Sequence, residues 1–305
     1  MKSRLVLVVI LCVVLKNSHA GDDEWWKTTS IYEIYIQSFK DSNKDGVGDL
    51  NGIYENLDYI KDLGIETIWI TPFYKSSMDS FGYDVIDFTE IDPLFGTMDD
   101  FKILLAGIHE RGMKLITDLV PNHMSYESDW FKKSVNRQEP YTDFFIWHDG
   151  KGYNETTKTP LPPNNWLSIF GGTAWEWNDR RKQFYYKLFS ETLPDLNYRN
   201  PKVREAIKNV LRFWLDLGVD GFRLDAVRYL MEVADFRDEP YVSPDISESD
   251  DYSSQMHIYT ADIDETYEIT HEWRLLLDEY EGKDNRTRFV PCKDRLRVPI
   301  CRDLR

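Results

Sequence analysis

The chain repeats one hydrophobic pattern, in which an amphipathic helix is followed by a glycine and then by a short apolar strand. Ile53, Leu57 and Ile60 recur at helical spacing and precede Gly64, after which the segment IETIWITP is almost wholly apolar. Side chains three or four residues apart share one face of a helix. The pattern therefore predicts a helix that ends at Gly64 and a buried strand directly after it.

Two further copies of this pattern carry helix start and stop signals. One helix is predicted to start at Thr97 with a capping-box-like sequence and to end at Gly112, before MKLITDLVPNH. The next starts at Asn200, which a proline follows, and its glycine at position 218 leads into GVDGFRLDAV. A fourth helix, with Trp273 and Tyr280 on its apolar stripe, is predicted to stop at Gly282.

With the apolar segment 31–39 placed first, the elements alternate as strand and helix along the chain. Such alternation predicts a parallel sheet with crossover helices, and both an open sheet and a closed barrel fit it. No glycine-rich dinucleotide fingerprint follows a strand. The connection between His123 and Asn200 is too long for a structureless loop, so we expect an inserted subdomain there. Residues 235–265 are acidic and predict an irregular surface segment.

Polar residues gather where the predicted strands end, which is where parallel β/α folds place functional side chains. Arg223 and Asp225 stand two apart in GVDGFRLDAV, so they share one face of that strand. The other polar residues at strand ends, or after the second strand, are Gln37, Ser38, Tyr83, Asp84, Asp118, Asn122 and His123. A recurrence at one end predicts a site rather than a set of structural groups.

Four segments in order, GYDVIDF (82–88), DLVPNH (118–123), LPDLN (193–197) and GFRLDAV (221–227), resemble the signature segments of the insect-type maltases. These are secreted α-glucosidases of the α-amylase superfamily, glycoside hydrolase family 13. The resemblance implies an α/β fold of the (β/α)8 TIM-barrel type, here incomplete with about four to five strands, and an inserted subdomain after the third strand. The expected parts are a signal peptide (1–20), the first part of the barrel (21–123), subdomain B (124–196), the continued barrel (197–289) and a divergent basic tail (290–305).

The resemblance also assigns roles at the site. Asp225 resembles the nucleophile of a retaining α-glucosidase, and the Arg223 guanidinium would stabilise its ionised form. Tyr83 would stack on the terminal sugar. The resemblance implies maltose, sucrose or another α-linked glucose oligosaccharide as the partner. Asp84 and His123 would hold its hydroxyls, with Asp118 and Asn122 supporting the site, and Phe170 of SIFGGTAW would lie over the cleft.

The loop DSNKDGVGD has hard oxygen ligands at alternating positions, a pattern that suits Ca²⁺. The expected ligands are Asp41, Asn43, Asp45, the Val47 carbonyl and Asp49. It is not an EF-hand, because glycine stands at the twelfth position and a strand precedes the loop. The resembling enzymes carry a structural calcium ion in a loop of this kind, and a solvated acidic turn is the alternative.

One catalytic group of that family is not found in this chain. The family's acid/base is a glutamate ending the fifth strand, whereas here the segment RTRFV runs into a proline and no glutamate follows. Five of the last fifteen residues are Lys or Arg, which indicates an alternative exon, a changed frame or a truncated product. We therefore expect an inactive or shortened α-glucosidase. The alternatives are a secreted sugar-binding or receptor-like member, and an amino-acid-transporter heavy chain, which would need a membrane helix ahead of the barrel.

The N-terminal segment predicts that the chain is secreted. Residues 1–20 read as a secretory signal peptide, with basic residues before a short apolar run and a small-residue exit, and no other segment is long enough to cross a membrane. The formal net charge of −16 disfavours a nucleic-acid partner. Cys292 and Cys301 could pair or stay free, and Asn154 and Asn285 begin glycosylation patterns.

Overall fold

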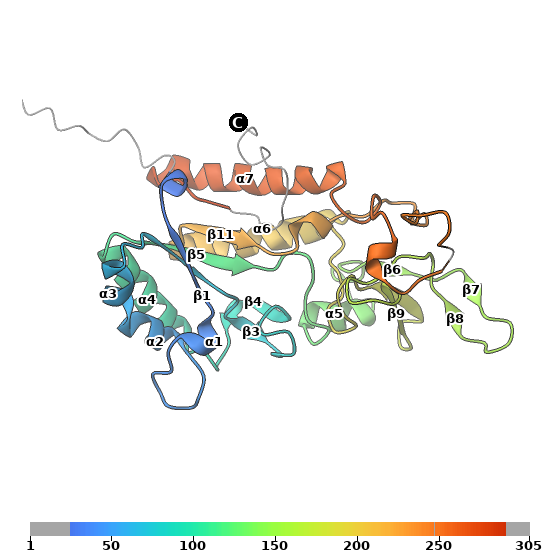
Figure 1. Cartoon of the computed structure of the whole chain (residues 1–305), viewed down its shortest axis with the longest axis horizontal. Coiled ribbons are helices and arrows are strands. Elements are labelled where there is room, and N and C mark those ends of the chain that lie inside the picture. Colours follow the sequence, from blue (N-terminus) through green and yellow to red (C-terminus); the bar gives the residue numbers. More distant parts are fainter. Residues whose placement is uncertain (1–24, 247, 291–305) are drawn as a thin grey trace, which may run out of the picture.

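A computed structural model describes residues 25–246 and 248–290. Its main sheet has four parallel strands in the order β1 (Ile31–Ile34), β2 (Thr67–Ile70), β5 (Lys114–Leu119) and β11 (Gly221–Leu224). Helices lie outside this sheet, and α7 crosses the top of the view in Figure 1. The fold prediction is confirmed, because these strands form part of a β/α barrel. The predicted signal peptide, the three cysteines and the tail beyond residue 290 lie outside the described residues.

The first strand is shorter than predicted. It ends at Ile34, and the chain turns into the short helix α1 (Ile36–Phe39), so Gln37 and Ser38 lie on that helix and not at a strand end. The amide of Ile36 donates to Thr71 Oγ1 at 3.2 Å, which bends the chain away from the sheet. The loop after α1 folds back on it through a hydrogen bond from Gly48 N to Gln37 O.

The predicted first helix is two helices, α2 (Leu50–Glu55) and α3 (Leu57–Asp62). Asn56 separates them with φ −109° and ψ 12°, and its side-chain amide donates to Gly52 O at 2.8 Å. An asparagine that bonds the local backbone competes with the helical hydrogen bonds. The sequence pattern of apolar residues continued through this break and could not reveal it.

The other start signals are confirmed. Thr97 and Asp100 form a capping box at α4 (Met98–Glu110), and Asn200 caps α6 (Pro201–Leu217). Gly218 ends α6 with φ +107°, a conformation that glycine adopts without steric cost. The helix α7 (Asp264–Asp284) continues past the predicted stop at Gly282, because Asn285 takes the left-handed conformation that ends it.

A fifth strand begins beside β11, where Phe289 bridges Gly221 in parallel. Phe222 N donates to Phe289 O at 2.8 Å and Phe289 N donates to Asp220 O at 3.0 Å. A Cβ at position 221 would lie 2.0 Å from the Phe289 oxygen, so only glycine permits this approach. Trp25 and Trp26 pack against the Phe289 ring, and Trp25 belongs to the turn η1 (Trp25–Lys27).

The predicted inserted subdomain follows β5. It contains α5 (Asp129–Val135) and an antiparallel sheet of β6 (Trp147–His148), β10 (Gln183–Tyr186) and β9 (Trp175–Asn178). The hairpin of β7 (Gly152–Tyr153) and β8 (Pro160–Leu161) projects at the right of Figure 1. Its own buried cluster includes Trp166, Trp175 and Tyr186.

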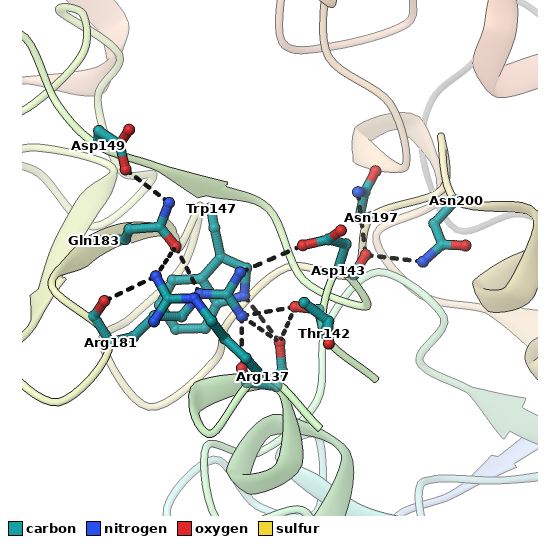
Figure 2. Close-up of polar contacts among 10 residues, drawn as sticks. Arg137, Thr142, Asp143, Trp147, Asp149, Arg181, Gln183, Asn197 and Asn200 are labelled. Atoms are coloured by element: carbon teal, nitrogen blue, oxygen red, sulfur yellow. Dashed lines mark hydrogen bonds and ion pairs between the residues drawn. The ribbon is translucent and has the colours of Figure 1, made fainter. Parts of the chain in front are cut away.

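Within the subdomain, buried Arg181, which lies between β9 and β10, binds the end of α5 and the chain after it (Figure 2). Its guanidinium donates to the backbone oxygens of Ser134 and Thr142 at 2.5 and 2.6 Å and lies 4.3 Å from the Trp147 ring centroid. Asn200, the cap of α6, donates to the carbonyl oxygen of the adjacent Asp143 at 3.0 Å. The Asn200 contact therefore links the subdomain to the barrel, whereas the Arg181 contacts lie within the subdomain.

Two features were not predicted from the sequence. An antiparallel pair, β3 (Tyr74–Ser76) and β4 (Val85–Ile91), precedes α4, with a register shift on each side of Lys75. The segment after β11 carries the turns η2 (Val227–Tyr229) and η3 (Tyr252–Ser254) and is less superficial than expected. Buried Glu239 accepts hydrogen bonds from the amides of residues 258 and 259 and from the Thr260 hydroxyl. Among the helices of the described ranges, none is long and apolar enough to cross a membrane.

Candidate active site

Asp225 follows the last residue of β11 and pairs with Arg223 two residues earlier. The distance from Arg223 Nη2 to Asp225 Oδ1 is 2.6 Å. The strand is shorter than predicted, since it ends at Leu224, and Ala226 takes φ +52°. The backbone still directs both side chains to one side, because Asp225 N donates to Leu119 O at 2.8 Å and so continues the ladder with β5.

Asp118 holds the other edge of the Arg223 guanidinium. Arg223 Nη1 lies 2.7 and 3.0 Å from the two carboxylate oxygens of Asp118, and both side chains are buried. Residue 118 pairs with residue 223 across β5 and β11, so the parallel register itself sets this contact. One cation thus lies between two carboxylates.

Tyr83 and Trp69 complete the surroundings of Asp118. Their Oη and Nε1 atoms donate to Asp118 Oδ2 at 3.2 and 3.3 Å. The Arg223 guanidinium carbon lies 5.1 Å from the Trp69 ring centroid and 5.9 Å from that of Tyr83. Burial raises the pKa of Asp118 to about 7, although the facing guanidinium opposes that rise.

His123 is buried beside the same group. Burial lowers its pKa to about 4, against the opposing effects of the Asp225 and Asp84 charges, so its imidazole is neutral at physiological pH. Within the described ranges, His123 Nε2 has no hydrogen-bond partner. A buried neutral imidazole with a vacant nitrogen can bind a ligand hydroxyl.

Asp84 is fully buried and held by the loop before it. Its carboxylate accepts hydrogen bonds from the Ser77 hydroxyl and from the amides of Asp79 and Ser80 at 3.0 and 3.2 Å. The structure therefore brings Tyr83, Asp84, His123, Arg223 and Asp225 to one region, and loop 77–80 occupies part of the acceptor capacity of Asp84.

Asp195 is a supporting residue that was not singled out, although its segment LPDLN was. It is buried, pairs with His123 through a β-bridge and accepts from Asn122 Nδ2 at 2.7 Å. Burial raises its pKa to about 8. Its place in a motif was the signal available in the sequence, whereas its contact with Asn122 spans 73 residues of chain and depends on the fold.

Phe170 is 75% exposed, the largest exposed fraction among the large hydrophobic side chains described. Its ring centroid lies 6.2 Å from that of Phe189, and the Phe189 ring lies 5.0 Å from the His123 ring. A row of three rings therefore leads from the subdomain surface to His123.

The predicted calcium loop is folded around its own acidic groups. Asp41 accepts from the amides of residues 43, 44 and 46, and Asp45 accepts from the side chain of Asn43. Asp49 caps α2 through Gly52 N and also accepts from Ser42. The described part of the chain brings no three His, Cys, Asp or Glu side chains together as metal ligands. A calcium ion here would thus also need the Asn43 oxygen and the Val47 carbonyl.

Three of the glutamates that follow β11 in the chain have surroundings of their own. Glu239 is tied to residues 258–260, and Glu268 lies on α7. Glu232 is buried, and burial raises its pKa well above its ordinary value. It lines a different cavity, described below.

Known proteins resemble most of this chain. The family model described as "Alpha amylase, catalytic domain" matches residues 33–291. Maltase A1 of Drosophila melanogaster is 46% identical over 296 residues, covering 94% of this chain and 51% of that protein. The amino acid transporter heavy chain SLC3A1 of Homo sapiens is 47% identical over 292 residues, covering 94% and 42%. The crystal structure of the alpha-glucosyl transfer enzyme XgtA superposes with a TM-score of 0.77 at 44% identity, covering 85% and 48%.

The chain spans about half the length of the curated relatives it matches. The part of this chain that the family model matches, residues 33–291, includes every residue of the group around Asp225.

Proposed function

Because the chain belongs to the family of the alpha-amylase catalytic domain, we propose that its site is an α-glucosidase site of the maltase type, with Asp225 as the nucleophile of a retaining mechanism. One observation carries the proposal: Asp225 is held at 2.6 Å by a guanidinium that Asp118 fixes from the other side. This arrangement orients the Asp225 carboxylate, as attack on an anomeric carbon requires.

The surrounding groups suit a terminal glucose unit of maltose, sucrose or another α-linked oligosaccharide. His123 Nε2 is available for a hydroxyl, and Asp84 offers its remaining lone pairs. Tyr83 would place its ring against the sugar, while Phe170 would contact the next unit from the subdomain surface. We propose these as substrate contacts.

Retaining hydrolysis also needs an acid/base carboxyl about 5 Å from the nucleophile. We propose that the 305-residue chain binds such sugars without cleaving them, since no glutamate of the described ranges takes that position. The same proposed lack of an acid/base carboxyl favours a second candidate, a non-catalytic sugar-binding member.

Calorimetric titration of the purified chain with maltose, alongside a glucose-release assay, tests both parts. We expect maltose binding that falls about tenfold in His123→Ala, because one good hydrogen bond contributes about 1.4 kcal/mol. Asp62→Asn, at an exposed position of α3, is the control and leaves binding unchanged. Failure of the chain to bind maltose would refute the α-glucoside site.

Glucose release tests the proposed lack of turnover, and its dependence on Asp225, measured with Asp225→Asn, distinguishes the two candidates. Release that disappears in Asp225→Asn would establish Asp225 as the nucleophile and overturn the proposed lack of turnover. Binding without release, unchanged in Asp225→Asn, would favour the non-catalytic sugar-binding member.

We also propose that the chain is secreted and glycosylated. Asn285 is exposed at the end of α7, and Asn154 lies in the turn between β7 and β8. Expression in a secreting eukaryotic cell should give medium-borne protein whose gel mobility increases after N-glycan removal. Asn154→Gln and Asn285→Gln should each remove part of that change.

A further inference from the structure

A second cavity lies apart from the group around Asp225. Its volume is about 310 Å³, and its walls come from the subdomain strand region 143–147, from residues 197–199 and from the segment 231–236 after β11. None of the proposed substrate-binding residues lines it. It is thus a separate hollow, within the size range of small-molecule sites.

The buried carboxyl of Glu232 is the main polar feature of this cavity. Glu232 is 6% exposed, and its carboxyl interacts with its own backbone amide and with the charge of Arg199. The nearest cation, Arg199, donates to the Glu232 carbonyl oxygen and pairs with Glu265 at 3.6 Å. Because Glu232 is buried and also lines the cavity, its carboxyl is a hydrogen-bonding group that a ligand in the cavity can reach.

The protonation of Glu232 limits the chemistry of that ligand. Burial raises its pKa well above the ordinary value, with the Asp195 charge adding to the rise. A protonated carboxyl both donates and accepts a hydrogen bond, as a hydroxyl does. It therefore suits a neutral hydroxylated molecule better than an anion.

Polar contacts connect the residues of the opposite wall, and Figure 2 shows those around Asp143, Trp147 and Asn197. Asn197 donates to Asp143 O at 3.2 Å, and Asp143 pairs with Arg181 at 3.3 Å. Arg181 and Phe131 cover the faces of Trp147, so its ring cannot stack on a ligand. This wall offers hydrogen-bonding groups of both kinds, and the rest of the lining combines Arg199 and Glu232 with apolar residues such as Met231.

From these observations we infer that the cavity binds a neutral polyhydroxylated ligand of monosaccharide size, with Glu232 as its central hydrogen-bonding group. Its lining includes residues that donate hydrogen bonds, such as Arg199 and Asn197, and residues that accept them, such as Glu232 and Asp143, and hydroxyl groups can pair with both kinds. The inference is independent of the proposed role of Asp225, since the two sites share no lining residue.

Glucose is the probe, and His123→Ala provides the background in which the first site is weakened. Exposed Ala234 lines the cavity, so Ala234→Trp fills its mouth without disturbing the core. Val242→Trp, at a position 57% exposed on the same segment and off the cavity, is the matched control. Calorimetry should give glucose binding that Ala234→Trp weakens at least about tenfold and Val242→Trp leaves unchanged.

Replacement of Glu232 tests the chemistry. Glu232→Gln, which keeps a donor and an acceptor, should retain glucose binding, whereas Glu232→Met, of similar length but without hydrogen-bonding oxygens, should lose it, with thermal unfolding confirming that each variant folds. Absence of glucose binding, or equal binding with and without Ala234→Trp, would overturn the inference. Tighter binding of ethanolamine than of glucose, abolished in Glu232→Gln, would overturn it in favour of a cation site.

Discussion

Asp118 and Arg223 face each other across two neighbouring parallel strands and form a buried ion pair, with two nitrogen–oxygen distances of 2.7 and 3.0 Å. The same guanidinium reaches Asp225 through its second terminal nitrogen. Asp118 thus positions Asp225 indirectly, through the Arg223 guanidinium that both carboxylates contact.

Removing the Asp118 charge should destabilise the fold. Asp118→Asn leaves the buried Arg223 guanidinium with one carboxylate in place of two, and loss of a partner in a buried pair costs about 3 kcal/mol in the free energy of unfolding. Asp99→Asn, at an exposed residue, should change that free energy by less than about 0.5 kcal/mol. Urea unfolding followed by circular dichroism measures both. Equal values for the two variants would show that the pair contributes nothing.

Arg181 should be essential to the packing within the subdomain, unlike its exposed neighbour Arg180. Arg181→Ala leaves the Ser134 and Thr142 carbonyl oxygens without their donor, at a cost of about 3 kcal/mol. Arg181→Lys should rescue little, because one ammonium cannot replace the planar fork. Hydrogen exchange should increase in residues 141–186 of both variants, whereas Arg180→Ala should match the unchanged chain.

Calcium should stabilise the chain if the loop 41–49 binds it as proposed. At a concentration one hundred times its dissociation constant, a ligand of the folded state adds about 2.7 kcal/mol. We expect a higher melting temperature with Ca²⁺ than after chelation, and no such difference in Asp41→Ala. Asp62→Ala serves as the exposed acidic control. A calcium response that persists in Asp41→Ala would place the ion elsewhere.

Asp220 should make stability depend on pH in the acid range. Burial alone would raise its pKa, but the hydrogen bond and charge of His109, with the amide of Leu115 and the charge of Arg286, hold the pKa below the ordinary 3.8. A depressed carboxyl pKa adds stability above the unfolded value of 3.8, and this stability is lost as the pH falls through the folded pKa.

Asp220→Asn should therefore lower the free energy of unfolding at neutral pH and flatten its decline below about pH 4. Urea titrations at a series of pH values measure this. An acid decline as steep in Asp220→Asn as in the unchanged chain would assign the effect to other carboxylates.

Local signals allowed the helix boundaries at Thr97, Asn200 and Gly218 to be predicted, because capping depends on neighbouring residues alone. The break at Asn56 and the turn after Ile34 depend on hydrogen bonds to Gly52 and Thr71 that only the folded chain provides. Gly282 was mistaken for a helix end, since a glycine with open space around it can also remain helical.

The strand-end rule and the four motifs predicted from the sequence alone that the group around Asp225 lies at one site. The contact of Asp195 with Asn122 and the cavity at Glu232 join segments tens of residues apart, and periodicity carries no information about them. Burial of Asp84 under loop 77–80 likewise required the three-dimensional arrangement.

The approach of Phe289 to Gly221 makes that seam asymmetric towards mutation. The hydrogen bonds of Phe289 to β11 use only its carbonyl and amide, which most residues supply, although its ring also packs against Trp25 and Trp26. Position 221 tolerates not even a methyl group, since its first carbon would overlap the Phe289 oxygen. The fifth segment can therefore pair with β11 only when residue 221 is glycine, whose α-carbon carries a hydrogen atom in place of a side chain.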